Sequence, residues 1–259
     1  MCGIHDPRLE KLGTTNQPGA TGEVLVNMID IGAETRGMDY IQCIPEKPLD
    51  VKRNPALSPQ VNRFVFVNHE GKRFVAEDSR RDVLRDAVLA QTKMEAFPVI
   101  DDVGFELQKN SKGPENEAAR KAGTLFIGNT IEEVAKKAGM DPATLKASCD
   151  AITKYARQGK DEQFGKDPYY LREVATGPFY VVRGKINALT SLNGVKVNAG
   201  LQVLDKNDHV IPGLYAIGHD AGGMYGDSYD LKVGEGTASA FAINSGRMAV
   251  MTILKEEKK

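Results

Sequence analysis

The feature that most constrains this chain is a cluster of glycines close to its C-terminal end. Seven of its 26 glycines fall between Gly213 and Gly236, after an apolar run over residues 210–217 and around the start of a helical pattern near Glu235. Such a stretch must turn tightly or let its backbone approach another group closely. Where a strand leads through glycines into a helix, the amide donors and the positive dipole end of the helix N-terminus can face an anion or a ligand oxygen. It also suits a plain connection without a ligand, and the Glu235 carboxylate would compete with an anion, so the spacing leaves both possibilities open.

Composition excludes several classes of protein. Of the 259 residues 41% are hydrophobic and 27% are charged, which is enough for a buried core. The formal net charge of −1 leaves no basic surplus for nucleic acid or an anionic membrane. The apolar stretch near Ala249–Leu254 is too short to span a bilayer, and the first 13 residues lack the apolar region of a signal peptide. We therefore expect a cytoplasmic protein with no nucleic-acid or membrane partner.

Metal and disulfide sites are not indicated by the sequence. The three cysteines, Cys2, Cys43 and Cys149, share no short spacing. Three histidines, His5, His69 and His209, lie far apart in loop-like sequence, and we expect none of them to bind a metal.

Hydrophobic periodicity predicts a mixture of helices and strands. The predicted helices cover residues 23–34, 81–91, 131–138, a longer segment from 142, and about 235–254. The predicted strands cover residues 40–44, a hairpin within 62–75, and residues 178–187, 194–204 and 210–217, the last of them buried.

Three local patterns make these helices more specific. Thr130 and Glu133 have the spacing of a capping box, with Gly139 as the stop. Asp141-Pro142 supplies an N-cap and a first-turn proline for a helix with Leu145, Cys149 and Ile152 on one face. In the first helix, Val24, Met28 and Ile31 share a face. The two ends of the chain are typical of α/β packing, and the middle is typical of a separate helical and β-hairpin domain.

Four stretches together resemble a known family. In chain order they are TTNQPGATG (14–22), VNHEGKRF (67–74), FYVV (179–182) and PGLYAIG (212–218). They resemble the flavoprotein family of fumarate reductase and succinate dehydrogenase, most closely its soluble fumarate, urocanate and ketosteroid-acting branches. The resemblance covers nearly the whole chain and is far more specific than a glycine motif alone.

The resemblance implies an α/β (α+β) fold: a partial Rossmann-like FAD-binding domain with an inserted α+β capping domain. Residues 1–42 and 188–259 would form the FAD-binding part, and residues 43–187 would form the cap that closes over the substrate.

The resemblance also implies which residues lie along FAD. They are Thr15, Asn16, Gly22, Thr190, Gly218, His219, Gly234, Thr237, Ala238 and Ser239. His219 stands where the family has an acidic flavin contact, and a residue in a surface turn is the alternative interpretation.

The family's GxGxxG pyrophosphate loop is missing from this sequence. The chain therefore begins well inside the family pattern, and we expect either a truncated chain or a half-protein completed by a partner that carries the ADP-binding half. An exposed sheet edge left by the absent strands would favour pairing with such a partner or homo-oligomerisation.

Two residues are candidates for catalysis. Arg81 falls on the family's proton-donating arginine, a role that needs a relay because the intrinsic pKa of arginine is so high. Tyr229 falls on the carboxylate-clamping arginine, in a loop that also resembles the ketosteroid-acting branch, and its phenol could donate to a ketone or pass a proton. The alternatives are a helix-start arginine paired with Asp78 or Asp82, and a tyrosine that packs against the cap.

Other substrate positions of the family are replaced here. The relay glutamate and second arginine correspond to Leu57 and Gln60, and the two carboxylate-holding histidines correspond to Ile44 and Leu189. A buried dicarboxylate needs positive charge or strong donors on both of its ends. The sequence therefore predicts a small-molecule substrate less charged than fumarate, such as an enone or a monocarboxylate, and a folded chain that holds no flavin remains the non-catalytic alternative.

Overall fold

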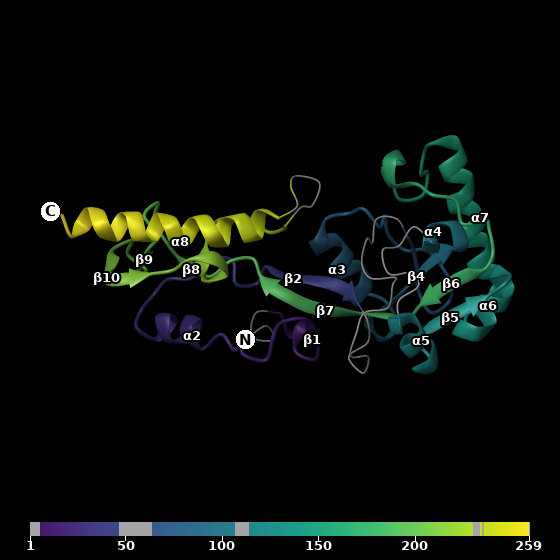
Figure 1. Cartoon of the computed structure of the whole chain (residues 1–259), viewed down its shortest axis with the longest axis horizontal. Coiled ribbons are helices and arrows are strands. Elements are labelled where there is room, and N and C mark those ends of the chain that lie inside the picture. Colours follow the sequence, from purple (N-terminus) through teal and green to yellow (C-terminus); the bar gives the residue numbers. More distant parts are fainter. Residues whose placement is uncertain (1–5, 47–63, 107–113, 230–233, 235, 259) are drawn as a thin grey trace. The chain divides into compact units, whose positions relative to one another are not determined.

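The computed structural model describes residues 6–46, 64–106, 114–229, 234 and 236–258. The chain divides into two compact units, which are described separately (Figure 1). Unit 1 comprises Met1–Cys43, Arg80–Asp82 and Ala188–Lys259, and unit 2 comprises Ile44–Ser79 and Val83–Asn187. Five residues named above lie outside the described residues: Cys2, His5, Leu57, Gln60 and Glu235.

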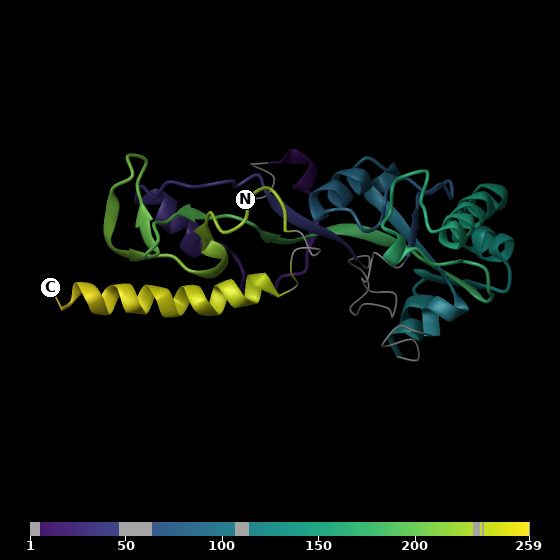
Figure 2. The same ribbon diagram turned by 90° about the horizontal axis from the view of Figure 1, so that it is seen from above.

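Unit 1 is built from short strands and two helices. Its elements are η1 (Pro7–Leu9), β1 (Gly13–Thr14), α2 (Glu23–Asp30), the start of β2 (Ile41–Glu46), the end of β7 (Gly184–Ser191), β8 (Val195–Lys196), β9 (Gln202–Leu204), β10 (Val210–Tyr215), η5 (Gly218–Asp220), β11 (Ala221–Gly222) and α8 (Thr237–Glu256). β1 and β2 pair with β7, β9 and β10 form an antiparallel pair, and β8 and β11 form a parallel one. Helix α8 runs along β8–β10 on the outside of this unit (Figures 1 and 2).

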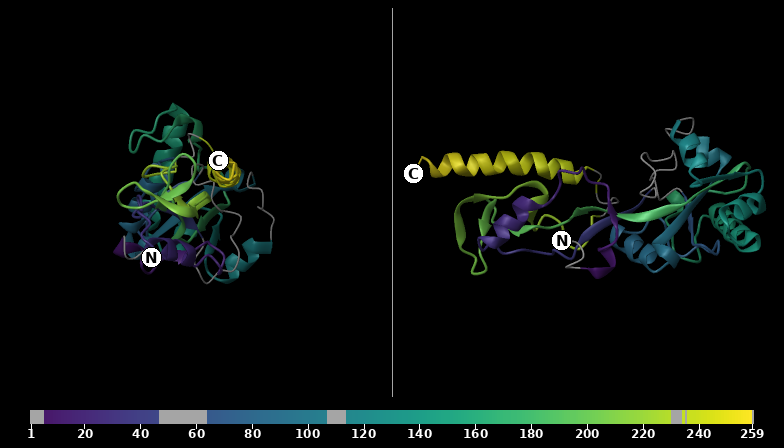
Figure 3. Two further views of the ribbon diagram at one scale, coloured as in Figure 1. Left: turned by 90° about the vertical axis from the view of Figure 1, so that its left-hand side faces the viewer. Right: turned by 90° about the horizontal axis from the view of Figure 1, so that it is seen from below.

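The core of unit 1 is small. It contains the buried residues Leu25, Met28, Ala33, Met38, Val195, Val203, Ala216 and Ala221, with Val197, Ile211, Leu214 and Phe241 packed beside them. Helix α8 buries small residues, because Ser245 and Ala249 are 0% and 6% exposed. Phe241 packs beside the core, but several other large apolar residues of the helix are exposed, with Ile243 75% and Leu254 50% exposed. Figure 3 shows strands along only one side of this helix.

Unit 2 is an antiparallel sheet with helices packed on it. Its elements are β3 (Val65–Val67), α3 (Arg81–Leu89, of which Val83 onward belongs to this unit), η3 (Thr92–Met94), β4 (Glu95–Asp101), α4 (Asp102–Glu106), α5 (Pro114–Lys121), β5 (Leu125–Gly128), α6 (Ile131–Ala138), α7 (Pro142–Gln158), η4 (Pro168–Tyr170) and β6 (Phe179–Val182). β4 pairs with β3, β6 and the start of β7, and β5 pairs with β6. The core lies where α6 and α7 cover the inner residues of β3, β4 and β6, including Val65, Val99 and Val181.

The predicted start and stop signals of α6 and α7 are confirmed. The Thr130 hydroxyl accepts a hydrogen bond from the Glu133 amide at 3.1 Å, and Gly139 ends α6 with a φ of 74°. Asp141 accepts from the Thr144 amide at 2.8 Å at the start of α7. The apolar face predicted for α7 is also present, because Leu145, Cys149 and Ile152 are buried.

The predicted hairpin over 62–75 is only partly present in the described residues, which begin at 64: the Asn68 amide donates to the Lys72 carbonyl at 3.0 Å and closes a turn. β3 pairs along its length with β4, and residues 72–75 form no strand; a single bridge joins Val67 to Arg73. β4 was not predicted, because it begins with the charged residue Glu95 and contains Pro98. Proline lacks an amide donor and is therefore unfavourable in a central strand. The structure places Pro98 opposite Phe66 and surrounds the buried Glu95 with cations instead.

Three strand predictions need correction. Residues 178–187 hold β6 and the start of β7, and 194–204 hold β8 and β9 with a turn at Leu201, whose φ is 65°. β10 is largely exposed rather than buried, because among the described residues β9 is the one strand that pairs with it.

The buried face of α2 also differs from the prediction. Leu25 and Met28 are buried, whereas Val24 and Ile31 are 64% and 63% exposed. The helix ends at Asp30, several residues earlier than predicted.

Candidate functional site

A close backbone approach in unit 1 fixes the glycine-rich region. A Cβ atom added to Gly194 would collide with the backbone carbonyl of Asp220, and one added to Gly222 would lie 2.9 Å from the carbonyl oxygen of Gly194. Only glycine lets β8 and β11 run this close together. Part of the glycine cluster therefore serves backbone packing, as the ligand-free interpretation of the sequence allows.

The loop after β11 is held by a buried asparagine. The side chain of Asn193, 3% exposed, accepts a hydrogen bond from the Gly223 amide at 3.0 Å and donates to the Gly226 carbonyl at 3.1 Å. No sequence signal singled out this residue, because its partners lie about thirty positions away. Residues 223–226 are therefore fixed at both ends.

The segment Arg80–Asp82 belongs to the same unit as this loop. Arg80 forms a bidentate ion pair with Asp82, the shortest N–O distance being 2.7 Å, and lies 3.5 Å from the carboxylate of Asp227. Burial raises the pKa of Asp82, but the Arg80 guanidinium and the nearby Ser228 hydroxyl outweigh it and lower that pKa overall. The contact between Arg80 and Asp227 thus links the segment that holds Arg81 to the loop that holds Tyr229. Arg81 itself is half-buried at the start of α3.

Tyr229 links this loop to helix α8. Its hydroxyl accepts a hydrogen bond from the Gly236 amide at 3.1 Å, and its ring meets that of Tyr225 edge-on, with centroids 5.4 Å apart. Gly236 is the N-cap of α8, has a φ of 81°, and offers no side chain to cap the helix. The first amide donors of the helix therefore lack a capping oxygen from Gly236.

The remaining predicted contacts near α8 are placed as follows. Gly234 is half-buried beside Thr237, Ala238 is half-buried and Ser239 is exposed. Gly218, with a φ of 57°, donates its amide to the Ser245 hydroxyl at 3.0 Å. His219 is exposed in η5.

The other predicted contacts lie near β1 and β7. The Thr15 amide donates to the Ala188 carbonyl at 3.0 Å, and Thr190 follows two residues later on β7. The Thr15 hydroxyl is buried and has no hydrogen-bond partner among the described residues. Asn16 is exposed and bonds to Thr14, and Gly22 caps α2 with a φ of 76° and no side-chain bond.

These features fit a flavin cofactor. A buried hydroxyl without a described partner, and two helix starts capped only by left-handed glycines, are suited to the carbonyl and phosphate oxygens of FAD. When bound, FAD would supply hydride chemistry, and Thr15, Gly22 and the start of α8 would hold it.

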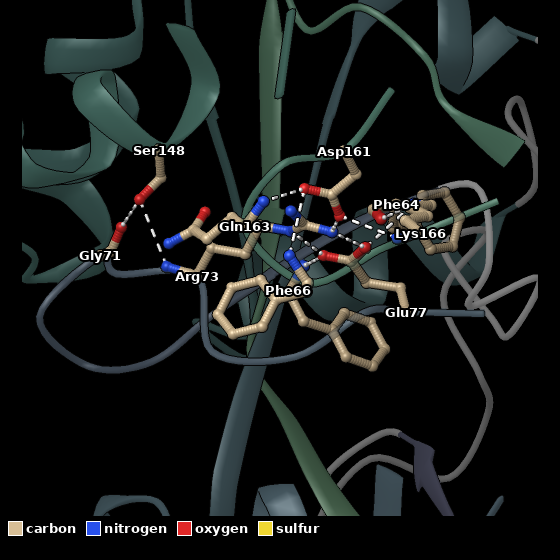
Figure 4. Close-up of polar contacts among 10 residues, drawn as sticks. Phe64, Phe66, Gly71, Arg73, Glu77, Ser148, Asp161, Gln163 and Lys166 are labelled. Atoms are coloured by element: carbon tan, nitrogen blue, oxygen red, sulfur yellow. Dashed lines mark hydrogen bonds and ion pairs between the residues drawn. The ribbon is translucent and has the colours of Figure 1, made fainter. Parts of the chain in front are cut away.

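Unit 2 contains a buried cluster of charges that the sequence analysis missed (Figure 4). The Arg73 guanidinium bonds both carboxylate oxygens of Glu77, at 2.9 and 3.0 Å, and the carboxylate of Asp161 at 2.8 Å. Lys166 completes the cluster, with its ammonium 3.0 Å from Glu77 and from the Phe64 carbonyl. Two cations balance two anions, which indicates a structural role, although Nη1 of Arg73 finds no hydrogen-bond partner among the described residues.

The pKa values in this cluster follow from burial and pairing. Burial lowers the pKa of Arg73, but its bonds to Glu77 and Asp161 outweigh this and raise it. Burial raises the pKa of Asp161, but Arg73 and the Lys166 and Gln163 amides bring it down to about 2. Burial dominates at Lys166 and lowers its pKa.

Other kinds of site are not visible in the described part of the chain. It holds no group of three His, Cys, Asp or Glu residues that could bind a metal ion, and none of its helices is both long and apolar enough to cross a membrane. The surface hollows described in unit 2, one beside α7 and one beside β5, contain none of the predicted site residues.

Comparison with known proteins decides the family. The model of the FAD binding domain family matches residues 1–232. The chain belongs to this family. It is 32% identical over 257 residues to a fumarate reductase (cytochrome) of Shewanella frigidimarina, covering 98% of this chain and 43% of that protein. It is 31% identical over 223 residues to a urocanate reductase of Eggerthella lenta, covering 84% of this chain and 36% of that protein.

Solved structures agree with this assignment. The open conformation of a flavocytochrome c3 fumarate reductase matches with a TM-score of 0.70 and 28% identity, over 98% of this chain and 43% of that one. A 3-ketosteroid delta1-dehydrogenase from Sterolibacterium denitrificans, at 24% identity and a TM-score of 0.71 over 93% of this chain and 48% of that one, shares the fold.

The predicted resemblance, the fold class and FAD as the family's cofactor are confirmed. The chain is a member of the fumarate reductase-like FAD-dependent oxidoreductases, and it spans less than half the length of these relatives.

The charge cluster of unit 2 gives a testable pH dependence. The pKa of Asp161 is lower in the folded chain than in the unfolded one, so its stabilisation is present above about pH 4 and is lost as the pH falls toward 2. Asp161→Asn should therefore lower the free energy of unfolding at pH 7 by about 1–3 kcal/mol, and flatten its decline over this acid range. Chemical denaturation at a series of pH values measures both effects.

The matched control is Glu173→Gln, which removes an exposed carboxylate paired with Arg157. Surface pairs contribute little, so this variant should behave like the wild type. An Asp161→Asn protein with wild-type stability and an unchanged acid slope would contradict the structural role of the cluster.

Proposed function

We propose that this chain is part of an FAD-dependent oxidoreductase that reduces, or forms, an activated C=C bond in a substrate less charged than fumarate. The proposal rests on two observations: the chain belongs to the FAD binding domain family, and the two segments that hold the candidate catalytic residues contact each other. Arg80–Asp82 and Asp227–Tyr229, which hold the candidate catalytic residues Arg81 and Tyr229, meet through the Arg80–Asp227 contact. Relatives named urocanate, vinyl phenol and acrylate reductases support the reaction class.

The proposed division into a flavin-binding part and a cap differs from the two compact units only at Cys43 and Arg80–Asp82, which belong to unit 1. Residues 1–42 and 188–259 hold the flavin, and residues 43–187 form the cap. The buried Thr15 hydroxyl and the glycine-capped start of α8 support the first assignment. The remaining proposed flavin contacts are Asn16, Gly22, Thr190, Gly218, His219, Gly234 and residues 237–239.

The substrate class follows from charge. The carboxylate of Asp82 is already paired with Arg80, and Asp227, in the loop after β11, places a second carboxylate 3.5 Å from the same arginine. A neutral phenol stands at position 229, and Ile44 and Leu189 are apolar. Two substrate carboxylates would lack the charged donors they need there, so a neutral enone or a monocarboxylate fits better.

Arg81 and Tyr229 have separate proposed roles. Arg81 delivers the proton to the carbon next to the activating group when a C=C bond is reduced, and it regains that proton from solvent or a neighbouring group. Tyr229 donates a hydrogen bond to the substrate oxygen. Its hydroxyl accepts from the Gly236 amide, so the phenol proton stays available for this donation.

The role of Arg81 predicts a loss of turnover without a loss of flavin. In Arg81→Gln, reduction of cyclohexenone or acrylate by a reduced viologen dye should fall about 10²–10⁴-fold, as expected for removal of a positioned proton donor. The flavin absorbance of the purified protein should stay unchanged. Steady-state kinetics and a visible spectrum measure the two effects.

Arg120→Gln is the matched control, because Arg120 is an exposed arginine paired with Glu117. Unchanged turnover in Arg81→Gln would remove this residue from the mechanism. A wild-type chain that stays colourless after mixing with FAD would favour the non-catalytic alternative.

We also propose that the outer face of helix α8 binds a further polypeptide. Helix α8 buries the small residues Ser245 and Ala249 and leaves several large apolar residues exposed, which is the reverse of a helix whose outer face meets solvent. We define its outer face by Ile243, Val250 and Leu254, which are spaced by seven and four positions. Because the chain spans less than half of its relatives, the occupant we assign to this face is a partner polypeptide that carries the GxGxxG-bearing half of the flavoprotein fold.

This assignment predicts a specific partner. The double variant Ile243→Lys/Leu254→Lys should lose the co-purifying polypeptide when the tagged chain is isolated from the organism that encodes it, since a buried lysine pair would disrupt the interface. Mass spectrometry should identify a GxGxxG-containing sequence with the wild type alone. Val103→Lys, at an exposed position of unit 2, is the control.

A wild-type chain that forms only homo-oligomers, or that captures no GxGxxG sequence, would contradict the assigned occupant. The cytoplasmic location expected from the sequence stays a prediction.

A further inference from the structure

Asn193 and Gly194 form the single Asn-Gly pair in the sequence. An asparagine followed by glycine is the dipeptide most prone to deamidation, because no side chain hinders attack of the next backbone nitrogen on the asparagine side chain. The fold needs both residue types at this place. Unit 1 therefore carries a chemically reactive pair at the contact that fixes its glycine-rich region.

Neither residue of this pair can be replaced without disturbing unit 1. A Cβ atom at position 194 would collide with the backbone carbonyl of Asp220. The Asn193 side chain uses both ends of its amide, since its oxygen accepts from the Gly223 amide at 3.0 Å and its nitrogen donates to the Gly226 carbonyl at 3.1 Å. Among carboxylate and amide side chains of this length, only asparagine can both accept and donate.

The same hydrogen bonds keep the Asn193 side chain from reacting. Deamidation requires the Gly194 nitrogen to reach Cγ of Asn193, and it requires water for the later hydrolysis. Asn193 is 3% exposed, and its amide is held by partners about thirty positions along the chain. The side chain must leave Gly223 and Gly226 before it can react, so the rate follows the fraction of molecules in which this loop is open.

We propose that Asn193 is a deamidation site that the fold protects, and that its modification permanently releases the loop after β11. The Gly194 nitrogen bonds to Cγ of Asn193 and the side-chain nitrogen leaves as ammonia, which closes a cyclic imide. Water then opens the ring at either carbonyl and gives aspartate or isoaspartate. Nothing is oxidised or reduced, and water is the only other reactant.

Neither product can restore the native contacts. The aspartate carboxylate is an acceptor only, so the Gly226 carbonyl loses its donor and faces a negative charge. Isoaspartate adds a backbone carbon directly before Gly194, where the approach of β8 to β11 leaves no room for a Cβ. A transient opening of the loop is thereby converted into a lasting one, in the segment that leads to Tyr229.

The first test follows the reaction in the unaltered chain. After incubation at mildly alkaline pH, trypsin releases residues 186–196, and chromatography with mass spectrometry separates the asparagine, aspartate and isoaspartate forms of Asn193. Asn193 should convert readily in guanidinium chloride, and at least about tenfold more slowly in the native chain, because the closed loop prevents the reaction. Equal rates in the two states, or no conversion in the denatured chain, would overturn the proposal.

Asn187 is the internal control for this test. It lies in the same peptide and is equally buried, at 3% exposed, but Ala188 follows it. Asn187 should stay intact over the time in which Asn193 of the denatured chain converts. Conversion of Asn187 as fast as that of Asn193 would contradict the assignment of the site to the Asn-Gly pair.

The second test asks whether the modification releases the loop. Ion-exchange chromatography isolates the deamidated fraction of aged native chain by its additional negative charge, and Asn193→Asp reproduces the aspartate product. Hydrogen exchange at residues 223–226 should be at least about tenfold faster in both than in the intact chain, with α7 unchanged. Exchange at the wild-type rate in the deamidated fraction would overturn the proposed release.

Asn27→Asp is the matched control for the second test. It adds the same charge at an exposed position of α2 in the same unit. Its exchange at residues 223–226 should equal that of the wild type. An acceleration as large as that of Asn193→Asp would show that charge alone loosens the loop, and this would contradict the role assigned to the Asn193 hydrogen bonds.

Discussion

The close approach of Gly194 to Asp220 and Gly222 is the contact on which the rest of the candidate site depends. A side chain at position 194 would push β8 and β11 apart, because it would meet backbone atoms that cannot rotate away. Asn193 stands next to this contact and holds the following loop through Gly223 and Gly226. The loop in turn carries Tyr229, whose hydroxyl reaches the start of α8. A backbone contact thus connects a parallel strand pair to the groups proposed for chemistry.

Buried polar groups in the two units differ in whether a nearby charge balances them. In unit 2, Arg73, Glu77, Asp161 and Lys166 form a network of equal positive and negative charge, which stabilises the fold. In unit 1, the hydroxyls of Thr15 and Tyr225 are buried without a described partner. A charge-balanced network is typical of structure, and unsatisfied hydroxyls in a unit whose two α-helices are capped only by glycine are typical of a site that a ligand completes.

The features that could be predicted from the sequence are those formed by residues close together along the chain. The caps of α6 and α7 are local hydrogen bonds, so their residue types and spacing were sufficient. The flavoprotein family was predictable because its sequence patterns extend along the chain. The ion pair of Arg73 with Asp161 and the role of Asn193 were not predictable, since their partners lie 88 and about thirty residues away. β4 was missed because Glu95 and Pro98 contradict strand propensity, and a pairing with strands from distant segments outweighs it.

Binding of FAD by unit 1 is the central claim, and hydrogen–deuterium exchange of the chain with and without added FAD tests it most directly. The account predicts slower exchange at residues 14–22, at 216–223 and at the first turn of α8, with no change in α7. Protection confined to α7, or no protection anywhere in unit 1 at saturating FAD, would contradict it.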